Sequence, residues 1–234
     1  GFGVESDSRK RISFGVDTGS DGNSEGGYSA SASVNVRYRP AASLEITSGP
    51  GFQRNHALAQ YVGTFVDPAA VATYGSRYVF GTLDQREFSL QTRVNFVMSP
   101  KLSFQLYMQP LVSVGAYTGF KELAQARTFD FTEYGRDSGS IEYHPVLSQY
   151  TVLPGDGGAP FTFDNPDFNF KSLRLNAIFR WEWRPGSAMY VVWTEQREDF
   201  DHPGEFEFRR DVRSTFRAPA DDVVMFKIAY WFQR

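Results

Sequence analysis

The sequence predicts an all-β chain: an antiparallel up-and-down transmembrane β-barrel of about eight strands, either complete or as the C-terminal part of a larger barrel. Three observations support this fold class: apolar and polar residues alternate over strand-length segments, short and long connections alternate along the chain, and no run of about 18 apolar residues occurs. At 234 residues the chain is expected to form one domain, over residues 1–234.

The clearest strand covers residues 28–39, where apolar and polar side chains alternate without a break. A period of two places one kind of side chain on each face of a strand, and about 9–11 residues suffice for a tilted strand to cross a bilayer. The same alternation occurs in residues 88–96, 102–109, 172–184 and 224–232, and shorter cases begin at Ile12, Leu44 and Met189.

The connections are of two kinds. Three are tight and contain proline, at residues 39–43, 98–101 and 184–187, and each predicts a hairpin turn. Between them we expect long polar connections at about residues 17–27, 53–85, 117–170 and 197–221. Long structureless loops are uncommon in compact soluble domains, whereas long external loops with short periplasmic turns are typical of outer-membrane barrels.

The alternation alone fits a soluble β-sandwich or barrel as well, in which the apolar side chains point inward. Two features favour the membrane form. The polar positions carry Ser, Asn, Gln, Arg and Glu, with Lys227 as the one mid-strand lysine, and aromatic residues such as Trp181 and Tyr230 lie near the short turns, as in an aromatic girdle.

Composition excludes several function classes. The net charge of −3 lacks the basic excess of a nucleic-acid-binding protein, and the absence of cysteine excludes disulfides, thiol nucleophiles and Cys-ligated zinc. We expect no cofactor, no metal and no catalytic residue. The histidines His56, His144 and His202 lie far apart in predicted connections, and the acidic run at residues 198–205 fits a solvated loop better than a Ca²⁺ site.

Several segments resemble a known family: QYVGT at 60–64, RYVF at 77–80, LDQR at 83–86, FQLYMQP at 104–110, NPDFNF at 165–170, FRWEWRPGS at 179–187 and FKIAYWF at 226–232. The chain resembles the C-terminal barrel of a domain-of-unknown-function family of bacterial outer-membrane proteins. In that family the N-terminal domain is similar to a family-9 carbohydrate-binding module. The resemblance covers nearly the whole chain and implies a longer protein, with that module and more barrel strands ahead of this segment. It transfers no catalytic motif.

Two sets of residues are candidates for function. Charged residues on the polar side of the predicted strands would face the lumen and either set its selectivity or brace the wall through ion pairs: Arg37, Arg39, Glu45, Glu87, Arg93, Arg174, Arg180 and Glu182. Aromatic residues in the predicted loops would bind sugars or partner surfaces, or else pack the loops together: Tyr61, Tyr74, Tyr78, Tyr134, Tyr143 and Tyr150.

The expected function is that of a non-enzymatic barrel in the bacterial outer membrane, which binds or passes an extracellular, glycan-related solute through its long loops. Its partners would be outer-membrane lipid and a glycan or protein at the external loops, and not nucleic acid. The alternative is a membrane anchor or assembly platform that presents loops to protein partners without transport. A third hypothesis is a hydrolase with its active site at the barrel rim.

Overall fold

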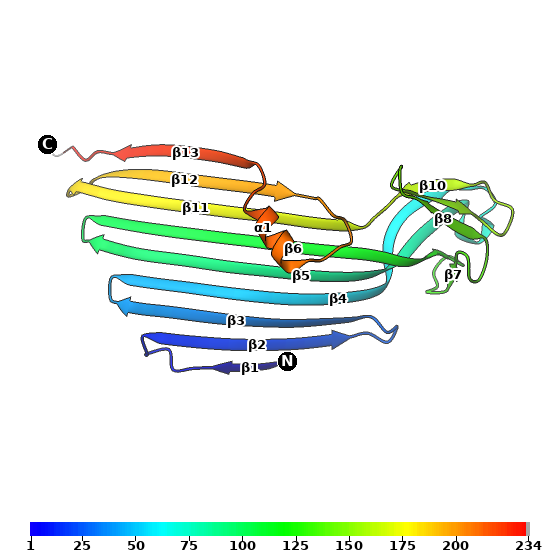
Figure 1. Cartoon of the computed structure of the whole chain (residues 1–234), viewed down its shortest axis with the longest axis horizontal. Helices are drawn as coiled ribbons and strands as arrows, with labels where there is room; N and C mark the ends of the chain where they lie inside the picture. The colour runs from blue at the N-terminus through cyan, green and yellow to red at the C-terminus, as the bar shows by residue number, and fades with distance from the viewer. Residues whose placement is uncertain (233–234) are drawn as a thin grey trace.

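Eight long strands make up most of the structure. The computed structural model describes residues 1–232 and contains one ten-stranded sheet in which the long strands pair antiparallel in chain order (Figure 1). The long strands are β2 (Ile12–Gly22), β3 (Tyr28–Ala41), β4 (Leu44–Val66), β5 (Ser76–Ser99), β6 (Leu102–Leu123), β11 (Phe168–Arg184), β12 (Ser187–Asp199) and β13 (Ala220–Ala229). β1 (Phe2–Glu5) pairs with β2, and β7 (Phe131–Glu133) pairs with β6. The predicted all-β class and antiparallel order are therefore confirmed.

The sheet is open within residues 1–232. Its two edges are β1 and β13, which lie on opposite sides of the sheet in Figure 1 and are not paired in this part of the chain. The described residues therefore do not make an eight-stranded barrel of their own, because the sheet twists and curves without bringing its edges together. They form one continuous wall.

The three tight turns are confirmed, and all lie at one end of the sheet (left in Figure 1). They join β3 to β4, β5 to β6 and β11 to β12, next to Pro40, Pro100 and Pro185. Gly186 has a φ of 79°, in the left-handed region that glycine adopts without the steric cost of a Cβ. These turns fix the register of the strands that they connect.

The predicted long connections at residues 17–27 and 53–85 are wrong. β2 runs to Gly22, and β4 and β5 remain paired as far as Val66 and Ser76, so that the loops shrink to residues 23–27 and 67–75. Beyond Phe52 and Phe88 polar residues occupy both faces, which removes the alternation although the backbone ladder continues. The segment at 117–170 contains β8 (Ser140–His144), β9 (Gln149–Leu153) and β10 (Phe161–Asp164), and the segment at 197–221 contains α1 (Phe208–Thr215).

The two faces of the sheet differ in chemistry. Residues that are paired across neighbouring strands point to the same side, so that the strand register defines rows of side chains. One row crosses the eight long strands as Ile12, Tyr38, Ile46, Val94, Leu106, Ala177, Trp193 and Val224. The adjacent row on the other side reads Ser13, Arg37, Thr47, Arg93, Tyr107, Asn176, Thr194 and Val223. We call these sides the apolar face and the polar face.

The apolar face is largely uncovered. Phe104 pairs with Phe179, and through Val191 the same row continues to Phe226, so that these aromatic rings lie side by side on one face and do not converge on a common centre. Phe226 is 69% exposed and Ile228 is 70% exposed. Within residues 1–232 no second layer of secondary structure covers most of this face.

Buried packing is concentrated at the far end of the sheet, opposite the short turns. There β8, β9 and β10 form a separate three-stranded sheet that lies beside the ends of β4, β5 and β6 (Figure 1). Val79, Phe120, Tyr134, Val152 and Phe163 form its buried apolar cluster. We call this unit, residues 131–164 with the adjoining strand ends, the distal module.

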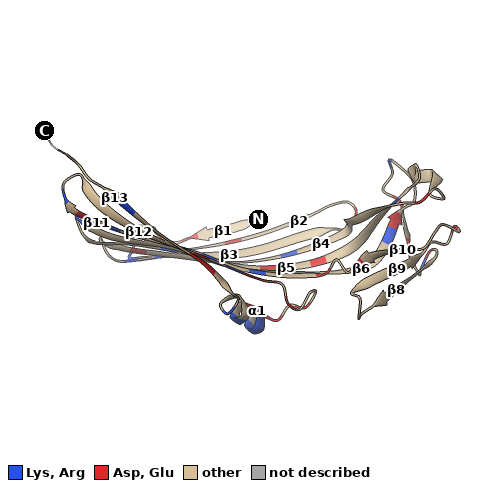
Figure 2. Ribbon diagram, turned by 90° about the horizontal axis from the view of Figure 1, so that it is seen from above, with Lys and Arg blue, Asp and Glu red and all other residues tan. Residues whose placement is uncertain are grey.

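α1 is the second element outside the main sheet, and it lies against one side of it (Figure 2). The Glu207 carboxylate caps the helix by accepting hydrogen bonds from the backbone N–H groups of Arg209 and Arg210. The Phe208 ring meets the ring of Phe88, a residue of the apolar face, at a centroid distance of 4.9 Å. α1 therefore covers part of the apolar face.

In residues 1–232 no helix has the length and apolar character needed to cross a membrane.

Candidate functional site

The polar face holds all eight charged residues predicted from the alternation. Register and strand parity place on one side Arg37, Arg39, Glu45, Glu87, Arg93, Arg174, Arg180 and Glu182. Two ion pairs form among them, Arg39 Nε to Glu45 at 3.7 Å and Arg180 Nη2 to Glu182 at 2.5 Å. These pairs brace neighbouring positions of the wall.

The other arginines of this set are differently placed. Arg93 lies over the Tyr107 ring, 5.1 Å from its centroid, which is within the range of a cation–π contact. Within residues 1–232 no carboxylate lies within 4.0 Å of the guanidinium groups of Arg37, Arg93 or Arg174. These three positive charges are available to a solute or to further parts of the protein.

Two adjoining hollows lie on the polar face between β5 and β13, and together we call them the polar groove. The first, of about 410 Å³, is lined by Arg93, Asn95, Gln105, Leu106, Tyr107, Asn176 and Ile178. The second, of about 320 Å³, is lined by Ser103, Gln105, Ile178, Arg180, Tyr190, Val192, Met225 and Lys227. Gln105 and Ile178 belong to both, so the hollows are continuous.

The polar groove is lined by several side chains that form hydrogen bonds. The Gln91 side-chain amide donates to the Tyr107 hydroxyl at 2.9 Å, and this hydroxyl donates to Gln109 at 2.8 Å. The Arg180 Nε donates to the Tyr190 hydroxyl at 3.3 Å. Amides, hydroxyls and ring faces at this density suit a polyhydroxylated solute. Sequence reasoning found the charged residues but missed Tyr107 and Tyr190, which only the cross-strand register places beside them.

The predicted loop aromatics divide into two groups. Tyr134 and Tyr150 pack the distal module: Tyr134 is buried, and the Tyr150 ring stacks on Phe163 at 5.3 Å. The Tyr143 ring lies 4.8 Å from that of Tyr150. These three residues therefore serve packing, the second of the two predicted roles.

The remaining tyrosines are accessible. The exposed fraction is 79% for Tyr74, 51% for Tyr61 and 36% for Tyr78. The Tyr61 ring meets Phe80 edge to face at 5.7 Å, which fixes its orientation. These three are placed to contact a partner, as is Tyr143, which is 40% exposed although its ring also packs on Tyr150.

A buried ion cluster holds the distal module to the sheet. The side chain of Arg77 is 2% exposed, and its nitrogens donate to Asp67 at 2.7 Å, to Glu122 at 2.8 Å and to Asp156 at 2.6 Å. Tyr134 donates its hydroxyl hydrogen bond to Glu122 at 2.9 Å. The Arg77 guanidinium makes five hydrogen bonds to these three carboxylates, whereas a lysine ammonium has only three N–H donors. The cluster joins the β4–β5 loop, β6 and the β9–β10 loop.

The environment of this cluster shifts the pKa values of its loop members. The backbone N–H of Ala69 and then the Arg77 guanidinium lower the pKa of Asp67, and the hydrogen bonds from Arg77 lower the pKa of Asp156. Burial, together with the nearby Glu122 carboxylate, raises the pKa of the Tyr134 hydroxyl. All three shifts keep the cluster in its ion-paired form at neutral pH.

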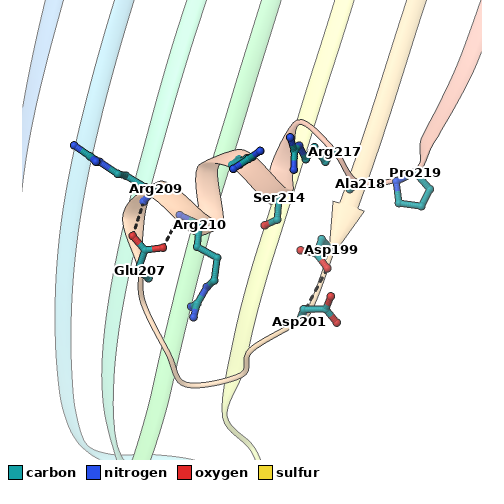
Figure 3. A pocket seen from close by; sticks show the side chains of 10 residues that line it. Asp199, Asp201, Glu207, Arg209, Arg210, Ser214, Arg217, Ala218 and Pro219 are labelled. Atoms are coloured by element: carbon teal, nitrogen blue, oxygen red, sulfur yellow. Dashed lines mark hydrogen bonds between the residues drawn. The ribbon is translucent and has the colours of Figure 1, made fainter.

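A third hollow lies beside α1 and is rich in arginine (Figure 3). It is an open groove of about 650 Å³ lined by Asp199, Asp201, Glu207, Arg209, Arg210, Arg213, Ser214, Arg217, Ala218 and Pro219. We call it the helix groove. Asp199 belongs to the acidic run considered as a Ca²⁺ site, but its carboxylate accepts a hydrogen bond from the buried Lys171 Nζ at 2.9 Å.

The part of the chain that is described contains neither a candidate metal site nor a cluster of histidines. No group of three His, Cys, Asp or Glu side chains in residues 1–232 could hold a metal ion. His56 lies within β4, not in a loop as predicted, because β4 extends far beyond its alternating part. Its Nδ1 is 2.9 Å from Asp84, and its ring stacks on Tyr28 at 5.3 Å.

These features define the chain as an all-β protein built mainly on one large antiparallel sheet, which has one apolar and one polar face. The family model described as Domain of unknown function (DUF5916) matches residues 1–233, and the chain belongs to that family. It has no match among curated proteins and none among solved structures.

Proposed function

We propose that the protein is a non-enzymatic β-barrel of the bacterial outer membrane that binds or passes a polyhydroxylated, glycan-related solute along its polar face. The observation that carries the proposal is the uncovered row of apolar side chains across eight strands, opposite a row of polar ones. An apolar surface of this extent needs a cover, and lipid is the cover that also accounts for the polar reverse side.

The height of the apolar face supports this proposal. On β11 the apolar face extends from Trp181, near the short turns, to Lys171, its first charged residue. This interval is about 33 Å along a strand at about 3.3 Å per residue. With a strand tilt of about 40° it spans about 25 Å, the height of the apolar band of outer-membrane barrels.

Aromatic residues lie at the turn end of this interval. The rings of Trp181 and Trp183 are 6.2 Å apart, and Arg184 lies 4.0 Å above the Tyr230 ring. Amphipathic rings of this kind are enriched at the boundary between membrane and water. The short turns would then face the periplasm, and the distal module would project outside the cell.

Closure of the barrel is part of the proposal. In lipid each unpaired backbone group at β1 or β13 would cost several kcal/mol, since no water is present to bond it. We infer that additional strands complete the wall and enclose the polar groove.

The test measures conductance and its dependence on the two faces. The full-length protein is reconstituted into planar bilayers, and Asn176→Trp is compared with Ala177→Trp, its neighbour on the opposite face. We expect the first variant to reduce the current and the second to leave it unchanged. Equal effects of the two variants would contradict the assignment of the faces.

The second candidate function is a membrane anchor or platform that presents its loops to a protein. The rigid distal module favours it, since Arg77 and its three carboxylates fix loops that a simple pore would not need to order. Insertion into bilayers without any current, with the distal module intact, would support this candidate over solute passage.

A further inference from the structure

Arginines dominate the helix groove, and their partners decide what it can bind. Arg210 is neutralised within the protein, by Asp211 at 3.0 Å and by Glu205 at 3.3 Å. Of the acids in the groove, Glu207 is used as the helix cap and Asp199 is paired with Lys171. The acidic side of the groove is therefore largely satisfied internally.

Three arginines of the helix groove make no ion pair with another described residue. Within residues 1–232 no carboxylate lies within 4.0 Å of the side-chain nitrogens of Arg209, Arg213 or Arg217. They are exposed and spaced four residues apart, which places them on one side of the helix and its C-terminal turn. Asp199 and Asp201 lie across the groove from Arg209 (Figure 3). The helix side of the groove therefore carries a net positive charge.

The place of α1 on the apolar face indicates what these arginines could contact. α1 packs on the apolar face through Phe208, at the row where Phe88 and Val112 give way to the charged Lys171. Phe208 and Phe216, on α1 and at its C-cap, are 47% and 43% exposed. Exposed aromatic and arginine side chains on one short helix are typical of a segment that lies in a membrane interface.

We propose that Arg209, Arg213 and Arg217 bind the phosphate groups of anionic lipid headgroups in the outer leaflet. This inference rests on the proposed function, because it requires the apolar face to meet lipid. The planar guanidinium matches phosphate oxygens in a bidentate manner, and the three side chains project where the headgroups begin if the apolar face is the lipid-covered surface. The same contacts would hold the β12–β13 connection against the outside of the wall.

The experiment titrates the full-length protein, in neutral detergent micelles, with diphosphoryl lipid A, with monophosphoryl lipid A and with inorganic phosphate. We expect preference in that order, and weaker lipid binding at high salt. Replacing all three arginines, as R209Q/R213Q/R217Q, should weaken binding of diphosphoryl lipid A about 100-fold, from about fivefold per arginine near an anionic surface. The corresponding lysine variant should retain most of the affinity.

The matched control is R9Q/R11Q/R127Q, which removes the same charge from exposed arginines outside α1 and should bind as the unchanged protein does. Because the three helix arginines make no side-chain ion pair in the described structure, the glutamine variant should keep its circular dichroism spectrum. Undiminished lipid binding by the folded glutamine variant would overturn this inference, as would free phosphate binding as tightly as lipid A. Failure of the unchanged protein to insert into neutral phosphatidylcholine vesicles would instead overturn the proposed function.

Discussion

A charge placed on either side of β11 offers a sharp test of which face meets lipid. Ala177 lies in the middle of the apolar face, between Leu106 and Trp193 on the neighbouring strands. Asn176, the preceding residue, lies between Tyr107 and Thr194 on the polar face. Arginine at both positions adds the same charge to the same strand, so that the two variants differ only in what the new side chain meets.

The expected magnitude follows from the depth of Ala177. An arginine on the lipid side of a membrane barrel costs about 2–4 kcal/mol near the bilayer midplane and about 0–1 kcal/mol near its interfaces. Ala177→Arg should therefore lower the folding equilibrium constant about 30-fold to 1000-fold. Asn176→Arg should change the free energy of unfolding by less than about 1 kcal/mol.

A third variant distinguishes lipid from a protein cover. Leu102, on the same apolar face, pairs with Trp181 next to a short turn, where lipid would give way to water. Leu102→Arg should cost no more than about 1 kcal/mol if depth in a bilayer sets the cost. A protein layer over the face would penalise burial without regard to such a depth profile.

The assay is urea-dependent folding of the full-length protein into phosphatidylcholine vesicles, with the free energy of unfolding taken from the midpoint and slope. The reasoning is refuted if Ala177→Arg and Asn176→Arg are equally stable, or if Leu102→Arg is as damaging as Ala177→Arg.

Three further predictions concern the distal module and one turn. Arg77→Met should leave Asp67, Glu122 and Asp156 without their cation and destabilise the distal module by about 3–5 kcal/mol, since Asp67 and Glu122 are largely buried. The measurement is hydrogen exchange, which should become faster in the distal module but not in β2 and β3; uniform exchange rates would contradict the prediction. Arg77 lowers the pKa of Asp156, so the Asp156 carboxylate stabilises the module fully above about pH 4, and this stabilisation is lost as the pH falls through the lowered pKa. Limited proteolysis should therefore cleave the module only in acid. Cleavage near pH 7 would contradict the ion cluster. Gly186→Ala should lower the free energy of unfolding by about 1–2 kcal/mol, because Gly186 has a φ of 79° and an added Cβ would lie 2.9 Å from the Cβ of Trp231. Gly49→Ala is the control: an added Cβ there makes ordinary contacts, and the variant should lose less stability in the same urea titration.

The sequence predicts the faces of the sheet well because a strand has a period of two. Residues 28–39 alternate strictly, and β3 takes the predicted faces over that length. The prolines at 40, 100 and 185 mark the turns for a local reason, since proline restricts its own φ and removes a hydrogen-bond donor. Features set by neighbours within a few residues could therefore be predicted.

The missed features depend on distant partners. In the far halves of β4 and β5 polar and apolar residues occur on both sides, so no alternation marks them, and these segments form strands by pairing with each other. Arg77 meets Glu122 and Asp156, which are 45 and 79 residues away along the chain, and no local pattern announces such contacts. The same holds for α1, whose eight residues carry only two large apolar side chains, Phe208 and Val212, and so show no repeated apolar stripe.

The polar face itself changes character toward one edge, and this bears on the choice between passage and anchoring. On β4, β5 and β6 one row of this face reads Glu45, Asn95 and Gln105, but on β11, β12 and β13 it continues as Ile178, Val192 and Met225. Met225 is 57% exposed on a side that the proposed barrel turns inward. Water is a poor neighbour for this apolar patch, so the enclosed space beside β12 and β13 should be occupied by further protein. A barrel filled on that side would leave its aqueous path along β5, β6 and the part of β11 that carries Asn176, where the first hollow of the polar groove lies. Its conductance should be smaller than that of a barrel lined by polar residues throughout.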